Sequence, residues 1–192
     1  RSSMFGEKAT AIAKEAQRAG DQFLRFDYSG TGASDGDFAQ GGIERWLEEA
    51  IALLPLVTES RLLLIGSSLG GWLALLLAKY LEQKSYPFQL SGGILIAPAV
   101  DYTERLIRPS LTQEEQRELE KSGVIYRASE YEQSGMPYYR AFLEEAMGYQ
   151  LLQSPFTLDA PFKVIYGRKD EVIPLDLILK LTAQCNSIYE VG

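Results

Sequence analysis

Hydrophobic positions along the chain follow two alternating patterns, one typical of amphipathic helices and one typical of buried strands. Apolar residues recur at helical spacing over residues 5–19 and 43–54, which predicts a helix in each place. A continuous apolar run over residues 62–65 predicts a strand that is buried on both faces, and residues 92–97 and 162–166 predict two further strands. Strands that alternate with helices indicate parallel βαβ units. The pattern therefore predicts an α/β fold with a mostly parallel, doubly wound sheet.

Further elements are predicted around these strands. Residues 22–27 predict another short strand, and residues 28–36 after it are rich in turn-forming residues. Residues 72–81 are apolar on almost all sides, so we expect a helix packed deep in the domain. A helix over residues 175–181 and a last strand over residues 187–191 complete the predicted order.

The composition changes over residues 101–160. This stretch is charged and rich in tyrosine, and its pattern is mostly that of helices. Thr112 and Glu115 have the spacing of a capping box, which predicts a polar helix that ends before Gly123. Because the stretch interrupts the strand pattern, we expect residues 101–160 to form a helical cap insertion within a single domain of residues 1–192.

Composition and charge narrow the classes of function. Of the 192 residues, 46% are hydrophobic and 23% are charged, which is the balance of a soluble globular domain. The net charge of −7 and the pI of about 4.8 exclude the basic surface that nucleic-acid binding requires. No apolar run is long enough to span a membrane, and no signal peptide is visible in these residues. The single Cys185 fits a reducing compartment, so we expect a cytoplasmic protein, or a mitochondrial one if the source is eukaryotic.

The strand over residues 62–65 leads directly into a G-x-S-x-G motif, Gly66-Ser67-Ser68-Leu69-Gly70. Between a strand and a helix, such a motif places its serine at the apex of a tight turn, with the hydroxyl exposed above the sheet. Ser68 is therefore the candidate nucleophile, and the backbone N–H of Leu69 is a candidate oxyanion donor. The two motif glycines are expected because side chains there would clash in so tight a turn. An ordinary strand-to-helix loop is the alternative interpretation, and Ser67 is expected to point away from the substrate.

A serine nucleophile needs a base that takes its proton and an acid that orients the base. In doubly wound hydrolases, the acid follows a later strand of the sheet. Asp170 meets this condition, because it lies in the turn-rich stretch after the predicted strand 162–166. Glu171 is the competing acid, and a helix cap or a turn residue is the alternative role for Asp170. Asp35 and Asp37 are expected in a solvated turn, so no metal and no cofactor is predicted.

Three motifs together resemble those of the α/β-hydrolase superfamily. Residues 27–34 (Asp-Tyr-Ser-Gly-Thr-Gly-Ala-Ser) are similar to the D-x-x-G-x-G-x-S loop of these enzymes, and the G-x-S-x-G motif follows in the expected order. Residues 167–174 are similar to their G-x-x-D-x-x-V-P acid loop, with Tyr166 where many members have histidine. Residues 27–30, the G-x-S-x-G motif extended to Trp72 and residues 102–106 together resemble the ABHD10-type serine esterases, which are acyl-protein thioesterases and carboxylesterases.

The resemblance implies hydrolysis of a carboxylic ester or thioester, carried by a small molecule or an acyl-protein, through an acyl-Ser68 intermediate. The family's catalytic histidine follows the last strand and its oxyanion loop precedes the first helix, whereas this chain begins at Arg1, ends at Gly192 and contains no histidine. We therefore expect a fragment that is truncated at both ends and inactive without the missing base. The alternatives are another serine hydrolase, such as a peptidase or an acyltransferase, and a non-catalytic binding protein.

Overall fold

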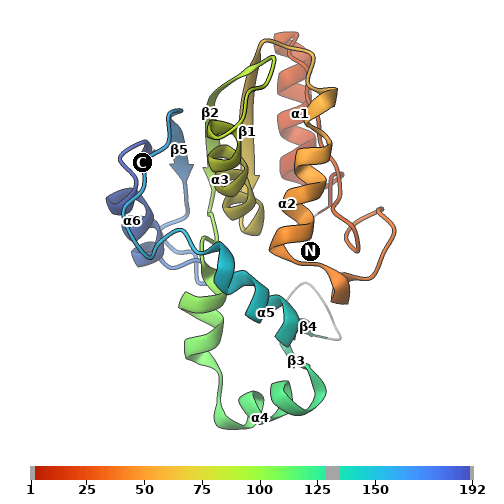
Figure 1. The fold of residues 1–192 in the computed structure, drawn as a ribbon, viewed down its shortest axis with the longest axis vertical. Helices are drawn as coiled ribbons and strands as arrows, with labels where there is room; N and C mark the ends of the chain where they lie inside the picture. Colours follow the sequence, from red (N-terminus) through yellow and green to blue (C-terminus); the bar gives the residue numbers. More distant parts are fainter. Residues whose placement is uncertain (1–2, 129–134, 191–192) are drawn as a thin grey trace.

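The sheet consists of four parallel strands in the order β1-β2-β5-β6. In the computed structural model, which describes residues 3–128 and 135–190, these strands are β1 (Arg61–Ser67), β2 (Gln89–Ile96), β5 (Phe162–Ile165) and β6 (Ile188–Glu190). Figure 1 labels β1, β2 and β5 of this sheet. Each neighbouring pair is parallel, so the carboxyl ends of all four strands lie along one edge of the sheet. The predicted parallel sheet is confirmed.

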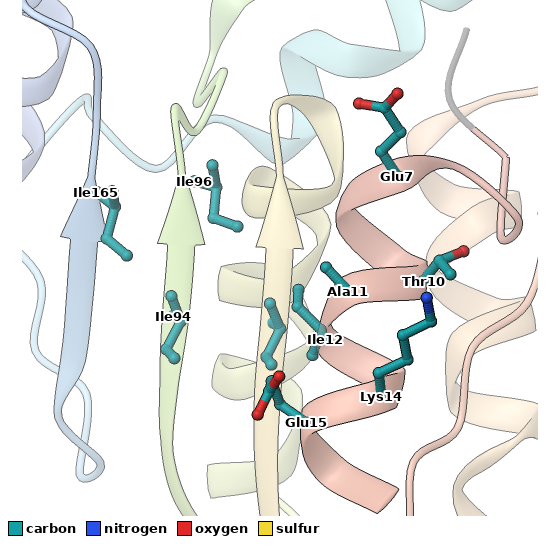
Figure 2. Close-up of a pocket in the computed structure, with 10 residues that line it drawn as sticks. Glu7, Thr10, Ala11, Ile12, Lys14, Glu15, Ile94, Ile96 and Ile165 are labelled. Carbon is teal, nitrogen blue, oxygen red and sulfur yellow. The ribbon is translucent and has the colours of Figure 1, made fainter. Parts of the chain in front are cut away.

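Helices lie on both faces of this sheet. α3 (Leu69–Glu82) connects β1 to β2, and α6 (Leu175–Gln184) connects β5 to β6. Because such connections are right-handed and the strand order runs in one direction, both helices cover the same face. α2 (Ile43–Ala52) packs against α3, whereas α1 (Glu7–Ala19) lies on the opposite face beside β1 (Figure 2). The sheet is therefore doubly wound, as predicted.

The face that carries α1 is open beside that helix. A groove of about 630 Å³ runs between α1 and the sheet (Figure 2). Four isoleucines line its sheet side: Ile65, Ile94, Ile96 and Ile165. Ile165 remains 45% exposed, whereas Val164, its neighbour in the chain, points to the opposite face and is fully buried.

α3 is buried along most of its length. Trp72, Leu75 and Ala78 are completely inaccessible, and α3 packs against β1, β2 and α2. The predicted deep helix over residues 72–81 is confirmed. Burial of each large apolar side chain stabilises the fold by roughly 1.5–3 kcal/mol, which makes this helix a main source of stability. None of the described helices is both long and apolar enough to cross a membrane.

The predicted strand over residues 22–27 is wrong. These residues belong to no β-ladder in the described part of the chain, and the next regular elements are the short helices η1 (Phe38–Gln40) and, after α2, η2 (Leu54–Leu56). Phe26 contacts Tyr28 edge to face, with 4.8 Å between the ring centroids. Both rings pack against a buried apolar cluster formed by Ala50, Leu54, Leu77, Leu81 and Phe88. Phe23 and Phe26 are thus partly buried without backbone pairing, whereas Leu24 is 50% exposed.

The 101–160 segment lies beyond the carboxyl edge of the sheet (Figure 1). Its described elements are η3 (Thr103–Ile107), η4 (Arg108–Ser110), α4 (Gln113–Ser122), β3 (Val124–Arg127), β4 (Met136–Tyr139), α5 (Arg140–Ala146) and η5 (Met147–Tyr149). The predicted capping box of Thr112 and Glu115 is confirmed, with Gly123 ending α4 at a φ of 79°. The antiparallel pair β3–β4 was not predicted, because each strand has four residues and β4 contains Pro137. The role of this segment as a cap stays a prediction.

Candidate active site

Ser68 occupies the turn between β1 and α3 in a backbone conformation that side chains rarely adopt. Its φ of 53° and ψ of −124° lie outside the common regions for residues other than glycine. Three backbone hydrogen bonds hold it there. Its N–H donates to the carbonyl oxygen of Ile96 (2.9 Å), and its own carbonyl oxygen accepts from Gly71 (2.9 Å) and Ala99 (3.0 Å). Ser68 is exposed, so the turn meets the backbone requirements of a nucleophile elbow.

The glycines of the motif contribute differently to this turn. A Cβ atom at Gly66 would lie 2.2 Å from the carbonyl oxygen of Gly70, so no side chain fits there. A Cβ atom at Gly70 would meet nothing within 4 Å, which contradicts the expected clash at that position. The second close approach is at Gly71, whose added Cβ would lie 2.7 Å from Cβ of Pro98. Gly66 and Gly71, rather than Gly66 and Gly70, are therefore required by packing.

Leu69 is the first residue of α3, directly after Ser68. Backbone N–H groups in the first turn of a helix have no acceptor within the helix, and partial positive charge accumulates at that end. The Leu69 N–H is therefore placed where an oxygen atom bearing negative charge beside Ser68 would be stabilised. Its oxyanion role stays a prediction.

Asp170 lies in the turn that follows β5. Its N–H donates to the carbonyl oxygen of Gly167 (3.0 Å), and its Oδ1 accepts from the N–H groups of Val172 and Ile173, both at 2.9 Å. These bonds fix the orientation of the half-buried carboxylate, while Glu171 is exposed. The N-cap of α6 is Pro174, so Asp170 organises the turn rather than capping that helix.

The strand register brings the Ser68 turn and the Asp170 turn to the same edge of the sheet. Ser67 pairs with Ile96 across β1 and β2, and Ile96 pairs with Ile165 across β2 and β5. The ends of β1 and β5 are therefore two strand spacings, or about 10 Å, apart. Such a separation of the strand ends leaves room for a third group between the two turns.

Hydrogen bonds of Asp27 stabilise the D-x-x-G-x-G-x-S loop of residues 27–34. The Asp27 carboxylate accepts from the N–H groups of Met4 (2.6 Å) and Ala33 (2.9 Å). The Ser34 hydroxyl donates to the carbonyl oxygen of Asp27 at 2.5 Å. Gly32 has a φ of 52°, and an added Cβ atom would lie 2.1 Å from the Asp27 carboxylate, so a side chain there would strain the backbone and displace the carboxylate. The motif thus shapes the loop, a role that its sequence pattern alone did not indicate.

Asp101 is a buried residue that the sequence reasoning missed. It is completely inaccessible and has a φ of 54°, and its carboxylate accepts from the N–H groups of Leu151 (2.8 Å) and Leu152 (2.7 Å). The only signal in the sequence was its position between a buried strand and the change in composition. In the same region, the indole N–H of Trp72 donates to the carbonyl oxygen of Tyr149 at 3.1 Å, which joins α3 to the 101–160 segment.

The acidic residues Asp35 and Asp37 are exposed and lie just before η1. Within residues 3–128 and 135–190, no group of three or more His, Cys, Asp or Glu side chains is arranged to hold an ion. Asp37 instead caps η1, because its Oδ1 accepts from the N–H of Ala39 at 2.9 Å.

Comparison with known proteins places the chain in a family. The family model described as serine aminopeptidase, S33, matches residues 6–138. A crystal structure of a protein from Agrobacterium vitis S4 superposes on the whole chain with a TM-score of 0.95 at 37% identity, and the chain covers 74% of it. The chain belongs to this family of α/β hydrolases.

Two relatives of this hydrolase carry more specific names. The structure of the alpha/beta hydrolase domain-containing protein 10 from mouse has a TM-score of 0.83 and 32% identity, with coverage of 100% of the hydrolase and 76% of the mouse chain. The palmitoyl-protein thioesterase ABHD10, mitochondrial, of Rattus norvegicus is 37% identical over 176 residues, which are 90% of the hydrolase. The hydrolase spans 57% of the length of that relative.

Proposed function

We propose that this hydrolase cleaves carboxylic esters or thioesters through an acyl-Ser68 intermediate. The observation that carries the proposal is an exposed serine at a φ of 53°, held by three backbone hydrogen bonds. Residues in such conformations cost about 1–3 kcal/mol, persist only where the surroundings hold them, and cluster at functional sites. The match to a hydrolase family and the similarity to a thioesterase support the same class of reaction.

In the proposed reaction, Oγ of Ser68 attacks the acyl carbonyl carbon, the bond to the leaving alcohol or thiol breaks, and water then hydrolyses the acyl-serine. The Leu69 N–H donates to the carbonyl oxygen as it gains negative charge. Asp170 orients the base that carries the serine proton to the leaving group. Because the 192 residues contain no histidine, the proposal requires a histidine contributed from outside them.

The proposed substrates are acyl-proteins and small acyl esters or thioesters. Ser68 is exposed, so an acyl group carried by another protein would have access to it. A relative named as a palmitoyl-protein thioesterase supports a fatty acyl group, and its name also supports a mitochondrial rather than a cytoplasmic location.

A fluorophosphonate probe tests the nucleophile. The protein translated from the complete reading frame is expected to be labelled at Ser68, and Ser68→Ala should abolish labelling and lower kcat by roughly 10⁴–10⁶-fold. Ser60→Ala is the matched control, because Ser60 lies at the amino end of β1, the opposite edge of the sheet. Residues 1–192 alone should not be labelled. Undiminished hydrolysis by Ser68→Ala, or a complete protein that is never labelled, would favour a non-catalytic binding protein.

A peptidase is the second candidate, favoured by the description of the matching family model as a serine aminopeptidase. Acyl-protein thioesters, p-nitrophenyl acyl esters and aminoacyl anilides should be compared as substrates of the same preparation. The proposal expects kcat/KM to be higher for the first two classes. A preference for anilides would replace the thioesterase proposal with a peptidase.

A further inference from the structure

Lys8 of α1 contacts the turn that carries Ser68. Its Nζ donates a hydrogen bond of 2.8 Å to Oγ of Ser67, which lies 59 positions away and directly precedes Ser68. Glu7, the first residue of α1, lies level with the carboxyl ends of the strands (Figure 2). The helix therefore brings a positively charged side chain to the edge of the sheet at which the proposed reaction takes place.

A second contact holds this end of α1. Three residues before the helix, the N–H of Met4 donates to Oδ1 of Asp27 at 2.6 Å, and the other oxygen of that carboxylate accepts from Ala33. The segment that leads into α1 is thus tied to the 27–34 loop, and the first turn of α1 is tied to the Ser68 turn. Lys8 reaches Ser67 from a backbone that is held in place.

We infer that Lys8 is a positioning residue for Ser68 that acts through Ser67, and this inference rests on the proposed function. The ammonium donor fixes the hydroxyl of Ser67 on the side of α1, which keeps Ser67 away from the substrate. The same ammonium places a positive charge against the residue that directly precedes Ser68. Charge that develops only in the transition state is stabilised there, so the effect falls on kcat rather than on KM.

A Ser67–Lys8 nucleophile pair is the competing interpretation of the same contact. It requires a neutral amine, because an ammonium has three donors and no acceptor for the serine proton. In the structure, Nζ of Lys8 donates to Oγ of Ser67, which is not the direction in which a base would activate a serine. Ser67 is also half-buried at the end of β1, whereas Ser68 is exposed in the turn.

Kinetics of two Lys8 variants in the complete protein test this role. Lys8→Met should lower kcat by about 5–30-fold, the effect of one nearby charge at intermediate dielectric, while KM stays within about 2-fold. Lys8→Arg keeps the charge and a donor and should restore kcat to within about 3-fold. Lys14→Met is the matched control on the same helix and should leave kcat unchanged, because Lys14 is also exposed and points into the groove. The deficit of Lys8→Met should shrink in about 1 M salt, where charges are screened within about 3 Å.

A thermal-unfolding double-mutant cycle of Lys8→Met and Ser67→Ala gives a readout that does not need activity. The contact predicts that the two changes in melting temperature are not additive. Additive changes would overturn the inference, as would an unchanged kcat of Lys8→Met in a protein labelled at Ser68, or a Lys8→Arg variant as impaired as Lys8→Met. A wild-type protein that is not labelled at Ser68 would refute the proposed function instead, and the cycle would still report on the contact.

Discussion

The carboxylate of Asp101 accepts the backbone N–H of Leu152 at 2.7 Å, across 51 positions of the chain. Arg105 adds a bond from Nη2 to the carbonyl oxygen of Leu152 at 2.6 Å. The 101–160 segment therefore leaves the sheet and returns to it through one buried polar cluster. If the segment forms the predicted cap, this cluster sets its position relative to the carboxyl edge of the sheet.

Asp101 should make stability depend on pH with a sign opposite to that of a typical carboxylate. Burial raises the pKa of its carboxyl above the ordinary 3.8, although the two backbone N–H groups and Arg105 oppose the shift. With the folded pKa raised, the stability that Asp101 contributes is fully present below about pH 3.8 and is lost as the pH rises through the folded pKa. Urea unfolding between pH 3.5 and 7 measures the free energy of unfolding of the wild type and of Asp101→Asn. The difference, wild type minus variant, should fall as the pH rises. Asp21→Asn, at an exposed carboxylate, is the control. A flat or rising difference would contradict the account.

Glu115 should show the usual sign. Its hydrogen bonds with the Arg127 guanidinium, at 2.7 and 2.9 Å, and with the Thr112 N–H lower the pKa of Glu115 to about 2. The contribution of Glu115 to stability is therefore present above its unfolded pKa near 4.5 and is lost as the pH falls from there towards 2. Glu115→Gln should lower the melting temperature at pH 7 and lose this effect in acid. Glu118→Gln, at an exposed position of the same helix, should change little at either pH.

Alanine at the two motif glycines should change stability in opposite directions. Gly66→Ala places a Cβ atom 2.2 Å from a backbone oxygen, so it should lower the free energy of unfolding by about 3 kcal/mol or more. Gly70→Ala meets nothing within 4 Å and removes a flexible residue from the first turn of α3, so it should raise the free energy by about 0.5–1 kcal/mol. Denaturant titration of both variants measures the two changes in the free energy of unfolding. Equal destabilisation by both would mean that the turn is not built as described.

Asp170→Asn separates the structural from the proposed chemical role of this side chain. The amide oxygen of asparagine can still accept from Val172 and Ile173, so the melting temperature should change little. Loss of the charge that orients the base should nevertheless lower kcat by about 10³–10⁴-fold in the complete protein. Glu171→Gln should leave kcat within about 3-fold. A larger loss in Glu171→Gln would exchange the roles of the two acids.

Hydrophobic periodicity was sufficient to predict the helices and strands whose apolar side chains recur at regular spacing. The buried strands, α1, α2, α3 and the capping box of α4 were all predicted, because each is specified by residues close together in sequence. The prediction of a strand over residues 22–27 was wrong, because a β-ladder also needs a neighbouring strand, which the sequence of this segment does not specify. The same limit applies to the site. Ser68 and Asp170 were predicted from motifs, whereas Asp101 and Lys8 act through partners 51 and 59 positions away.

The isoleucine-lined groove beside α1 has a consequence for handling this polypeptide in the laboratory. Parallel sheets are almost always covered on both faces, and large exposed apolar patches promote association. Prepared as residues 1–192, the molecule offers water a sheet face formed by Ile65, Ile94, Ile96 and Ile165. Such a preparation should bind environment-sensitive dyes while still folded, and it should precipitate as its concentration is raised. Fluorescence of a bound dye would then be a poor criterion of unfolding, and the melting curves proposed above are better followed by circular dichroism.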